Sequence, residues 1–361
     1  MNRGSRRRRS TVIAPLATVA VAVMTSVTMP APVAAQASPN AHQPLLAFVS
    51  NEVSHDVTVV DLDARRVIAT IPVGGRARGV QAAPGGRTIF VAVSDDSPTV
   101  ETSADAIVAI DVAKRAIVAR IEGGTDPEQL AVSVDGKKLF AANEDAGTAT
   151  IIDLASGRTL SSAVVGIEPE GVAASPDGKW VYVTAETSNS VSMIDARTRR
   201  VIGNVLVDVR PRAVAFSPDA RRAWVTAEIG GSLTVIDTRA HRVIATIPLE
   251  NNAGKPVGVV VSRDGKHVFV ANGATGRVSV VDAAKLAVVD SVRVGSRPWG
   301  IALAPNGALL VTADGMSDQI SIVDTRTMTV VGRVPVGRRP WGVAIVGGGA
   351  ARAGRESSRA R

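Results

Sequence analysis

A short apolar segment that ends in aspartate recurs seven times along the 361-residue chain. Four of the six intervals between these aspartates are 42 residues long, and the other two are 50 and 45. The aspartates are Asp61, Asp111, Asp153, Asp195, Asp237, Asp282 and Asp324. A fixed period in the low forties, with several short apolar runs per repeat, is typical of β-propellers with one four-stranded blade per repeat. The repeats therefore predict an all-β, seven-bladed β-propeller.

The repeat at residues 170–208 shows the expected blade most clearly. It contains strand A (GVAAS), a Pro-Asp-Gly turn, strand B (WVYVTA), strand C (SVSMID) and strand D (VIGNVLV). Alternating apolar residues, β-branched side chains and the Pro/Asp/Gly turn support these assignments. At the ends of the repeat array, residues 45–73 supply only strands B, C and D, and residues 340–346 supply only a strand A. We therefore expect the C-terminal strand A to join the N-terminal strands B–D and seal the ring.

Residues 1–37 are expected to be a secretory signal peptide. They hold five arginines and no acid, then an apolar run, and end in Ala35-Gln36-Ala37. The alternative is a membrane anchor, which Pro15 and several hydroxyl residues within the apolar run disfavour. Cleavage would leave a periplasmic or secreted protein without a membrane span. The domain boundaries are then 1–37 for the signal peptide, 38–346 for the propeller and 347–361 for a disordered basic tail.

The formal net charge of +8 does not belong to the propeller. Five of these charges lie in the signal peptide and three in the tail, so residues 38–346 contain as many bases as acids. A neutral body gives no support for nucleic-acid binding. The chain has no cysteine, which excludes disulfides, thiolate metal sites and cysteine nucleophiles.

The sequence resembles the YVTN-repeat propeller family through Tyr182-Val183-Thr184. Three longer strings are similar to exported propellers known as PQQ-dependent catabolism-associated proteins: residues 126–145, residues 186–231 and the PWGVAI ending. This resemblance implies a propeller found alongside pyrroloquinoline quinone alcohol dehydrogenases, and it implies no particular reaction. Related propellers also include lactonases and redox subunits that act in the central channel.

One strand-B position is occupied by six of the ten aromatic residues, with Leu310 expected to complete the set of seven. The aromatics are Phe48, Phe90, Phe140, Tyr182, Trp224 and Phe269. A side chain that recurs at one blade position is expected to pack between blades. The recurrent strand-C aspartates are interpreted as turn residues for the same reason.

The connections from strand D to the next strand A vary in charge from blade to blade, although their Pro and Gly pattern repeats. They should line the mouth of the channel. The residue before the glycine forms one ring: Arg78, Glu128, Glu170, Arg212, Val257, Trp299 and Trp341. The residue two positions earlier forms another: Arg76, Asp126, Glu168, Arg210, Lys255, Arg297 and Arg339. We expect an acidic sector, and a basic sector that includes the two tryptophans.

Two interpretations of these rings remain open. They can be surface ion pairs that neutralise one another, or a funnel that binds a ligand or partner through charged hydrogen bonds and stacking. Both length insertions, within residues 94–105 and 250–254, fall on the face shared by the D–A and B–C loops. The B–C loops on that face are expected to begin with Glu52, Glu144, Glu186, Glu228 and Asp314. Because binding residues often lie in loops on a rigid scaffold, this face is the predicted binding face.

No catalytic constellation accompanies the rings. The four histidines form no spaced metal-binding pair, and no nucleophile elbow, P-loop or dinucleotide fingerprint occurs. We therefore expect no cofactor and no metal. The sequence favours a monomeric, non-enzymatic binding protein whose partner is a protein or a small ligand, such as a periplasmic dehydrogenase or cytochrome. The alternative is a lactonase-like or redox enzyme that uses Glu128, Glu170, Arg78 and Arg212.

Overall fold

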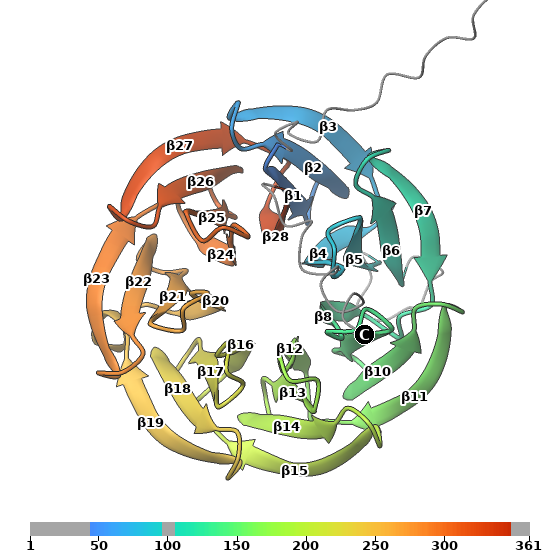
Figure 1. Ribbon diagram of the computed structural model, residues 1–361, viewed down its shortest axis with the longest axis vertical. Coiled ribbons are helices and arrows are strands. Elements are labelled where there is room, and N and C mark those ends of the chain that lie inside the picture. The colour runs from blue at the N-terminus through green and yellow to red at the C-terminus, as the bar shows by residue number, and fades with distance from the viewer. Residues whose placement is uncertain (1–43, 96–104, 348–361) are drawn as a thin grey trace, which may run out of the picture. The chain divides into compact units, whose positions relative to one another are not determined.

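The computed structural model describes residues 44–95 and 105–347, which form seven four-stranded antiparallel sheets arranged as the blades of a ring (Figure 1). This is the all-β, seven-bladed fold that the repeats predict. In each blade strand A lies nearest the centre of the ring and strand D forms the outer edge. The predicted signal peptide and nearly all of the predicted tail lie outside the described residues.

The strands follow the predicted A–B–C–D order in every blade. The A strands are β28 (Pro340–Val346), β4 (Arg76–Ala82), β8 (Pro127–Val132), β12 (Pro169–Ala174), β16 (Pro211–Phe216), β20 (Pro256–Val261) and β24 (Pro298–Leu303). The B strands are β1 (Leu46–Asn51), β5 (Thr88–Ser94), β9 (Lys138–Asn143), β13 (Trp180–Ala185), β17 (Arg222–Ala227), β21 (His267–Asn272) and β25 (Leu309–Asp314). The C strands are β2 (Asp56–Asp61), β6 (Ala106–Asp111), β10 (Thr148–Asp153), β14 (Ser190–Asp195), β18 (Ser232–Asp237), β22 (Arg277–Asp282) and β26 (Gln319–Asp324). The D strands are β3 (Arg66–Pro72), β7 (Ala116–Ile121), β11 (Arg158–Val164), β15 (Arg200–Leu206), β19 (Arg242–Pro248), β23 (Ala287–Arg293) and β27 (Thr329–Pro335).

The ring closes where β28 pairs with β1. The two strands are antiparallel, with Phe48 opposite Ala344. The first blade therefore has the order β28-β1-β2-β3, which joins the two ends of the described chain. Closure removes the open sheet edge that an incomplete blade would expose, and it confirms the predicted role of residues 340–346.

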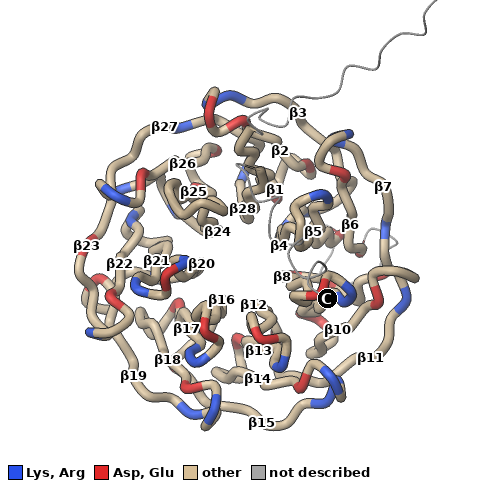
Figure 2. The backbone as a smooth tube through the Cα atoms, in the orientation of Figure 1, with Lys and Arg blue, Asp and Glu red and all other residues tan. Residues whose placement is uncertain are grey.

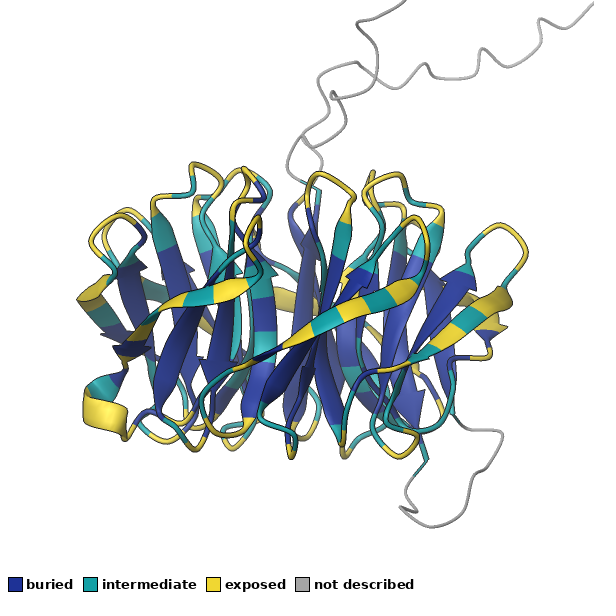
Figure 3. Cartoon of the chain, turned by 90° about the horizontal axis from the view of Figure 1, so that it is seen from below, coloured by how far each residue is buried: buried dark blue, intermediate teal, exposed yellow. Residues whose placement is uncertain are grey.

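The core consists of apolar side chains of strands B and C packed between neighbouring blades, whereas the D strands are largely exposed (Figure 3). The strand-B aromatics are buried there as predicted; Tyr182, for example, packs against Phe216 of the next blade with ring centroids 4.8 Å apart. One prediction was wrong by a residue. Leu309 pairs with Asp324, so Val311 and not Leu310 occupies the aromatic position in β25.

The strand-C aspartates form turns, as predicted. Asp195 accepts hydrogen bonds from the backbone N–H groups of Arg197 and Thr198. The other six aspartates accept the same kind of hydrogen bond within the turn that follows strand C. These carboxylates are therefore committed to backbone geometry. They lie on the face opposite the D–A and B–C connections.

The D–A and B–C connections share one face, which is the lower face in Figure 3. A 3-10 turn, η1 (Glu250–Asn252), occupies the insertion between β19 and β20, and all three of its residues have left-handed backbone angles. The other insertion lies mostly outside the described residues. Within the described part of the chain, no helix is long and apolar enough to cross a membrane.

Candidate functional site

The seven A strands place the first predicted ring around one mouth of the central channel. Each A strand contacts the next one around the centre. Glycine permits this approach, because a Cβ atom at Gly300 would lie 2.5 Å from the carbonyl oxygen of Trp341, and one at Gly258 would lie 2.5 Å from that of Trp299. No side chain fits at such a distance. Two blades differ from this pattern, with Gln129 and Ala213 at the glycine position.

The second ring surrounds the first and connects it to the B–C loops. All of its residues except Arg76 have left-handed backbone angles, with φ between 44° and 63°. The carbonyl oxygens of these residues accept hydrogen bonds from the residues that follow strand B. The nitrogen–oxygen distance is 2.8 Å from Glu186 to Glu168 and 2.8 Å from Glu228 to Arg210. These bonds hold the strained backbone and bring the B–C loops against the mouth.

Four of the five acids expected at the start of the B–C loops occupy that position: Glu52, Glu144, Glu186 and Glu228. Asp314 does not, because it is the last residue of β25, one position earlier. Its buried carboxylate accepts hydrogen bonds from the hydroxyls of Thr312 and Ser321 and from the Gly295 N–H. Asp314 therefore stabilises its own blade. The position after strand B is Gly273 in one of the remaining blades and Gly315 in another.

Arg78 lies among three glutamates on one side of the mouth. Its guanidinium forms an ion pair with Glu128, and it lies 3.5 Å from a carboxylate oxygen of Glu52 and 3.8 Å from one of Glu144. The Glu128 side chain is fully buried, and the Arg78 side chain is only 13% exposed. We call these four residues the Arg78 cluster.

Arg212 lies three blades beyond Arg78 and forms a second cluster, again of one arginine and three glutamates. It is ion-paired with Glu186, and it lies 2.7 Å from Glu170 and 3.8 Å from Glu228. The four side chains of this Arg212 cluster are all at most 10% exposed. Arg210 lies above it and pairs with Glu186 at 2.6 Å and with Glu228 at 3.4 Å.

The predicted acidic sector is therefore largely neutralised by arginines, which corrects the expectation of separate charged sectors. Asp126 also pairs with Arg76, at 3.3 Å. Glu168 is the exception, since its contact is with the Thr187 hydroxyl and no cation pairs with it among the described residues. The ion-pair interpretation of the rings is correct for these acids, but most of the pairs are buried and not on the surface. Breaking a buried pair costs far more than breaking an exposed one.

The two tryptophans are held by other protein groups. The guanidinium carbons of Arg212 and Arg297 lie 5.1 and 4.6 Å from the ring centroid of Trp299, a cation–π geometry. The rings of Trp299 and Trp341 are 6.2 Å apart, and Trp341 is only 7% exposed. The two rings therefore form a wall of the site that positions the arginines. They do not form an open surface on which a ligand could stack. The Trp299 indole N–H is buried and has no hydrogen-bond partner within the described structure.

Three cations remain on the other side of the mouth: Lys255, Arg297 and Arg339, from consecutive blades. We call them the cationic arc. All three are exposed, and in residues 44–95 and 105–347 no carboxylate forms an ion pair with Lys255 or Arg339. Among the described carboxylates, Arg297 approaches Glu228 alone, at 3.9 Å. The charged positions around the centre of the ring can be followed in Figure 2.

A cavity of about 500 Å³ opens at the mouth between these groups. Arg297, Arg339, Met316 and both tryptophans lie on one side of it. Arg78 and Arg212 lie on the other, with three of their glutamates: Glu52, Glu144 and Glu170. A second cavity of about 280 Å³ continues into the channel. Four residues line both cavities and therefore stand at the junction between them: Glu170, Arg212, Trp299 and Trp341.

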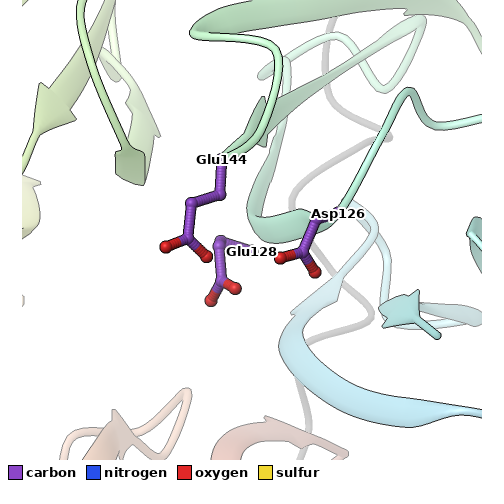
Figure 4. A group of neighbouring side chains, drawn as sticks. All are labelled: Asp126, Glu128 and Glu144. Atoms are coloured by element: carbon purple, nitrogen blue, oxygen red, sulfur yellow. The ribbon is translucent and has the colours of Figure 1, made fainter. Parts of the chain in front are cut away.

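Asp126, Glu128 and Glu144 place one carboxylate oxygen each within 4.8 Å of one another, a grouping that could hold a metal ion (Figure 4). Arginines compete for this position, since Arg78 is paired with Glu128 and reaches Glu144, and Arg76 is paired with Asp126. A guanidinium already supplies the positive charge that a metal would bring. We therefore assign the group to the ion-pair network.

Burial changes the acidity of the clusters. Removal from water, opposed by Arg212, raises the pKa of Glu170 to about 8. Burial and then the charge of Asp126 raise the pKa of Glu144. For Arg212, burial disfavours the charged form, but the charges of Glu170, Glu186 and Glu228 outweigh it and raise its pKa. Glu170 is therefore a carboxyl group that holds its proton near neutral pH, at the narrow part of the site.

Comparisons with known proteins support the fold. A family model described as a YNCE-like β-propeller matches residues 104–262, and one described as a seven-bladed lactonase β-propeller matches residues 204–331. No curated protein matches the chain. Together with the structure, these matches show a seven-bladed β-propeller; the closer resemblance to PQQ-associated propellers stays a prediction.

Solved structures are similar over most of the chain. The hydrazine synthase of Kuenenia stuttgartiensis is 23% identical with a TM-score of 0.68, over 77% of this chain and 92% of that one. The periplasmic gluconolactonase of Pseudomonas aeruginosa is 21% identical with a TM-score of 0.69, over 85% and 99%. A functionally unknown protein of Desulfotomaculum acetoxidans is 18% identical with a TM-score of 0.70, over 84% and 99%. Likeness at this level of identity shows the fold alone.

Proposed function

We propose that this chain is a binding protein whose mouth cavity takes a carboxylate or similar oxyanion of a ligand or partner. The observation that carries the proposal is the contrast between the two sides of the mouth. The buried charges of the Arg78 and Arg212 clusters are paired, whereas Arg297 and Arg339 line the cavity with little or no acidic partner among the described residues. Exposed guanidinium groups beside a cavity suit paired hydrogen bonds to a carboxylate.

The other groups at the cavity would complete such a site. The buried Trp299 N–H has no acceptor in the described structure and could donate to a ligand oxygen. Protonated Glu170 could donate as well. Met316, which is 59% exposed, and Trp299 offer apolar surface to the rest of the ligand. Such a mixture of apolar wall and few polar groups is usual for ligand pockets.

A panel of simple carboxylates tests this proposal. Acetate, succinate, citrate and gluconate would be titrated by calorimetry into the wild type and into Arg297→Ala/Arg339→Ala. We expect a di- or polycarboxylate to bind the wild type, and the double variant to bind it about tenfold to a hundredfold more weakly. Arg239→Ala/Arg326→Ala, which removes two arginines of the opposite face, is the matched control. Equal affinity in both double variants, or no binding of any carboxylate, would contradict the proposal.

We also propose that the protein is exported, with residues 1–37 removed, and that it serves a periplasmic quinoprotein or cytochrome-linked oxidation. The basic and apolar N-terminal segment and the resemblance to PQQ-associated propellers support this placement. Mass spectrometry of the protein from a periplasmic fraction tests the first part. A mature N-terminus at Ser38 is expected, and an intact N-terminus in the cytoplasmic fraction would contradict export.

Lactone hydrolysis is the second candidate, and Glu170 favours it. A carboxyl group with a pKa of about 8 can accept a proton from a water molecule once it is ionised. That water would attack the lactone carbonyl, while Arg212, 2.7 Å from Glu170, or the Trp299 N–H stabilises the negative charge on the carbonyl oxygen. The bond from the carbonyl carbon to the ring oxygen would then break, and Glu170 would return its proton to that oxygen, which gives the hydroxy acid. The match to the lactonase family model supports this candidate.

Hydrolysis of D-glucono-δ-lactone, corrected for the spontaneous reaction, decides between the two. An enzyme should lose turnover in Glu170→Gln, because the amide cannot accept the proton. It should keep turnover in Glu122→Gln, which alters an exposed acid that lines neither cavity. If the wild type gives no rate above the spontaneous one, the binding function alone remains.

A further inference from the structure

Five large aliphatic side chains are exposed beside the mouth, on the side opposite the cationic arc. They are Val164, Ile167, Leu206, Val209 and Ile229, with exposed fractions of 78, 61, 77, 46 and 51%. We call them the aliphatic patch. Scattered single apolar residues on a surface are normal, whereas a cluster of them marks a contact surface.

The patch is specific to two of the seven blade junctions. Ile167 and Val209 each lie one residue before a residue of the second ring. At that position the other five junctions have Gly75, Thr125, Gly254, Ser296 and Arg338. At the position of Val164 and Leu206, the last residue of strand D or its equivalent, others have proline, glutamate or arginine. Fold requirements common to all blades therefore do not explain these aliphatic residues.

Hydrogen bonds join the loops that carry the patch into one continuous surface. The Ile167 N–H donates to the Ser188 hydroxyl, and the Arg210 N–H donates to the Asn189 side chain in the same B–C loop. The next B–C loop is attached in turn, because the Gly230 N–H donates to the Val209 carbonyl at 3.0 Å. The aliphatic side chains therefore lie on hydrogen-bonded loops that adjoin the second ring.

Charge identifies what fits this surface. The cationic arc lies across the mouth from the patch and has no close acidic partner among the described residues, so it suits an acidic group of a ligand. Glu168 adjoins Ile167 and has no cation partner in the described residues, so it favours a base near the patch. A ligand that meets all three features has a carboxylate at one end and aliphatic groups with a base at the other. A polypeptide segment has this chemistry, whereas a small organic acid would leave the patch uncovered.

We propose that the mouth face docks a polypeptide segment of a partner protein, with its acidic side chain or C-terminal carboxylate in the cavity and its aliphatic residues on the patch. This inference rests on the proposed binding function, because it assigns the source of the carboxylate. Proteins commonly recognise peptides in this way, by burying a few aliphatic side chains of the peptide beside a charged group that fixes its orientation.

Selection from a display library of random 12-residue peptides tests the docking surface. The wild type should enrich peptides that combine an acidic group with aliphatic residues and a base. Synthetic copies should bind Leu206→Ser/Val209→Ser at least about tenfold more weakly than the wild type, because two apolar contacts are lost. The matched control is Val118→Ser/Val289→Ser, which removes two exposed valines from outer strands.

The results separate this inference from the proposed function. If simple carboxylates bind the wild type and Leu206→Ser/Val209→Ser equally, while enriched peptides lose affinity only in the patch variant and in Arg297→Ala/Arg339→Ala, both proposals stand. If carboxylates bind but no peptide is enriched, or the peptides bind the patch variant as tightly as the wild type, the docking surface is wrong and the carboxylate site remains. If neither carboxylates nor peptides bind, both are wrong.

Discussion

The two sides of the channel mouth use the same side chains for different purposes. On one side, Arg212 is buried, Arg78 is largely buried, and each meets three glutamates. On the other, Arg297 and Arg339 are exposed at the cavity, and the B–C position next to Arg297 is Gly315 and not a glutamate. The backbone is alike on both sides, since the carbonyls of six residues of the second ring, all except Arg76, accept a hydrogen bond from the residue after strand B.

This difference shows how a repeated scaffold separates stability from binding. The glutamates that begin four of the B–C loops form ion pairs with Arg78 or Arg212. Beside Lys255 and Arg297 that loop position is glycine. Beside Arg339 it is Glu52, but the Glu52 side chain pairs with Arg78, so all three cations are left for an external group. We therefore assign a structural role to the Arg78 and Arg212 clusters and a binding role to the cationic arc.

Arg212→Met should have the largest effect on stability. It leaves three acidic side chains, all at most 10% exposed, without the cation that they share. Removal of one partner of a buried ion pair costs about 3–5 kcal/mol. Urea denaturation followed by tryptophan fluorescence measures this loss. A decrease no greater than that of Arg221→Met, an arginine that is 63% exposed, would show that the cluster is not structural.

Arg78→Met should destabilise the protein less, by about 1–3 kcal/mol, because water can reach two of its partners. Glu52 and Glu144 are 21% and 28% exposed, whereas no acid of the Arg212 cluster exceeds 10%. The same denaturation experiment gives the ranking. A larger loss for Arg78→Met than for Arg212→Met would reverse the expected order of the two clusters.

Stability should also depend on pH through Glu170. Burial raises its folded-state pKa to about 8, above the ordinary value of 4.5, so between these values the folded state holds a proton that the unfolded state has released. The free energy of unfolding therefore falls as pH rises through this window, by at most about 1.4 kcal/mol per pH unit, and the fall ends above the folded-state pKa. Glu170→Gln should remove this decline, and parallel pH profiles for the variant and the wild type would contradict it.

Arg297→Ala/Arg339→Ala should have the smallest effect on stability, within about 0.5 kcal/mol of the wild type. Both side chains are exposed, and neither belongs to a buried ion pair. The same variant should lose carboxylate affinity, so the two measurements separate binding from folding. A loss of stability comparable to that of Arg78→Met would place the cationic arc in the structural network.

The repeats were sufficient to predict the blades, the closure of the ring and the two rings of the mouth, because strand order and turn glycines fix which residues begin each A strand. The two errors, at Leu310 and Asp314, arose because β25 was placed one residue out of register with the other B strands. Counting four residues from the turn glycine leads from Gly178 to Tyr182 and from Gly307 to Val311, which would have corrected both Leu310 and Asp314.

The pairing of the charges could not be predicted from one blade at a time. Glu186 reaches Arg212, 26 residues away and in the next blade, through a B–C loop that is fixed by the bond from its N–H to Glu168. The sequence indicated that Glu52, Glu144, Glu186 and Glu228 lie on the mouth face. It did not indicate that they neutralise Arg78 and Arg212, because that depends on contacts between blades. The cationic arc is consequently smaller than the predicted basic sector.

The most direct test of the binding role is a crystal structure of the protein with the tightest-binding carboxylate of the panel. We expect a carboxylate oxygen within hydrogen-bond distance of Arg297 or Arg339 in the mouth cavity, with the Arg78 and Arg212 clusters unchanged. A ligand bound outside this cavity, or one that breaks the Arg212–Glu170 pair while leaving Arg297 and Arg339 free, would contradict it.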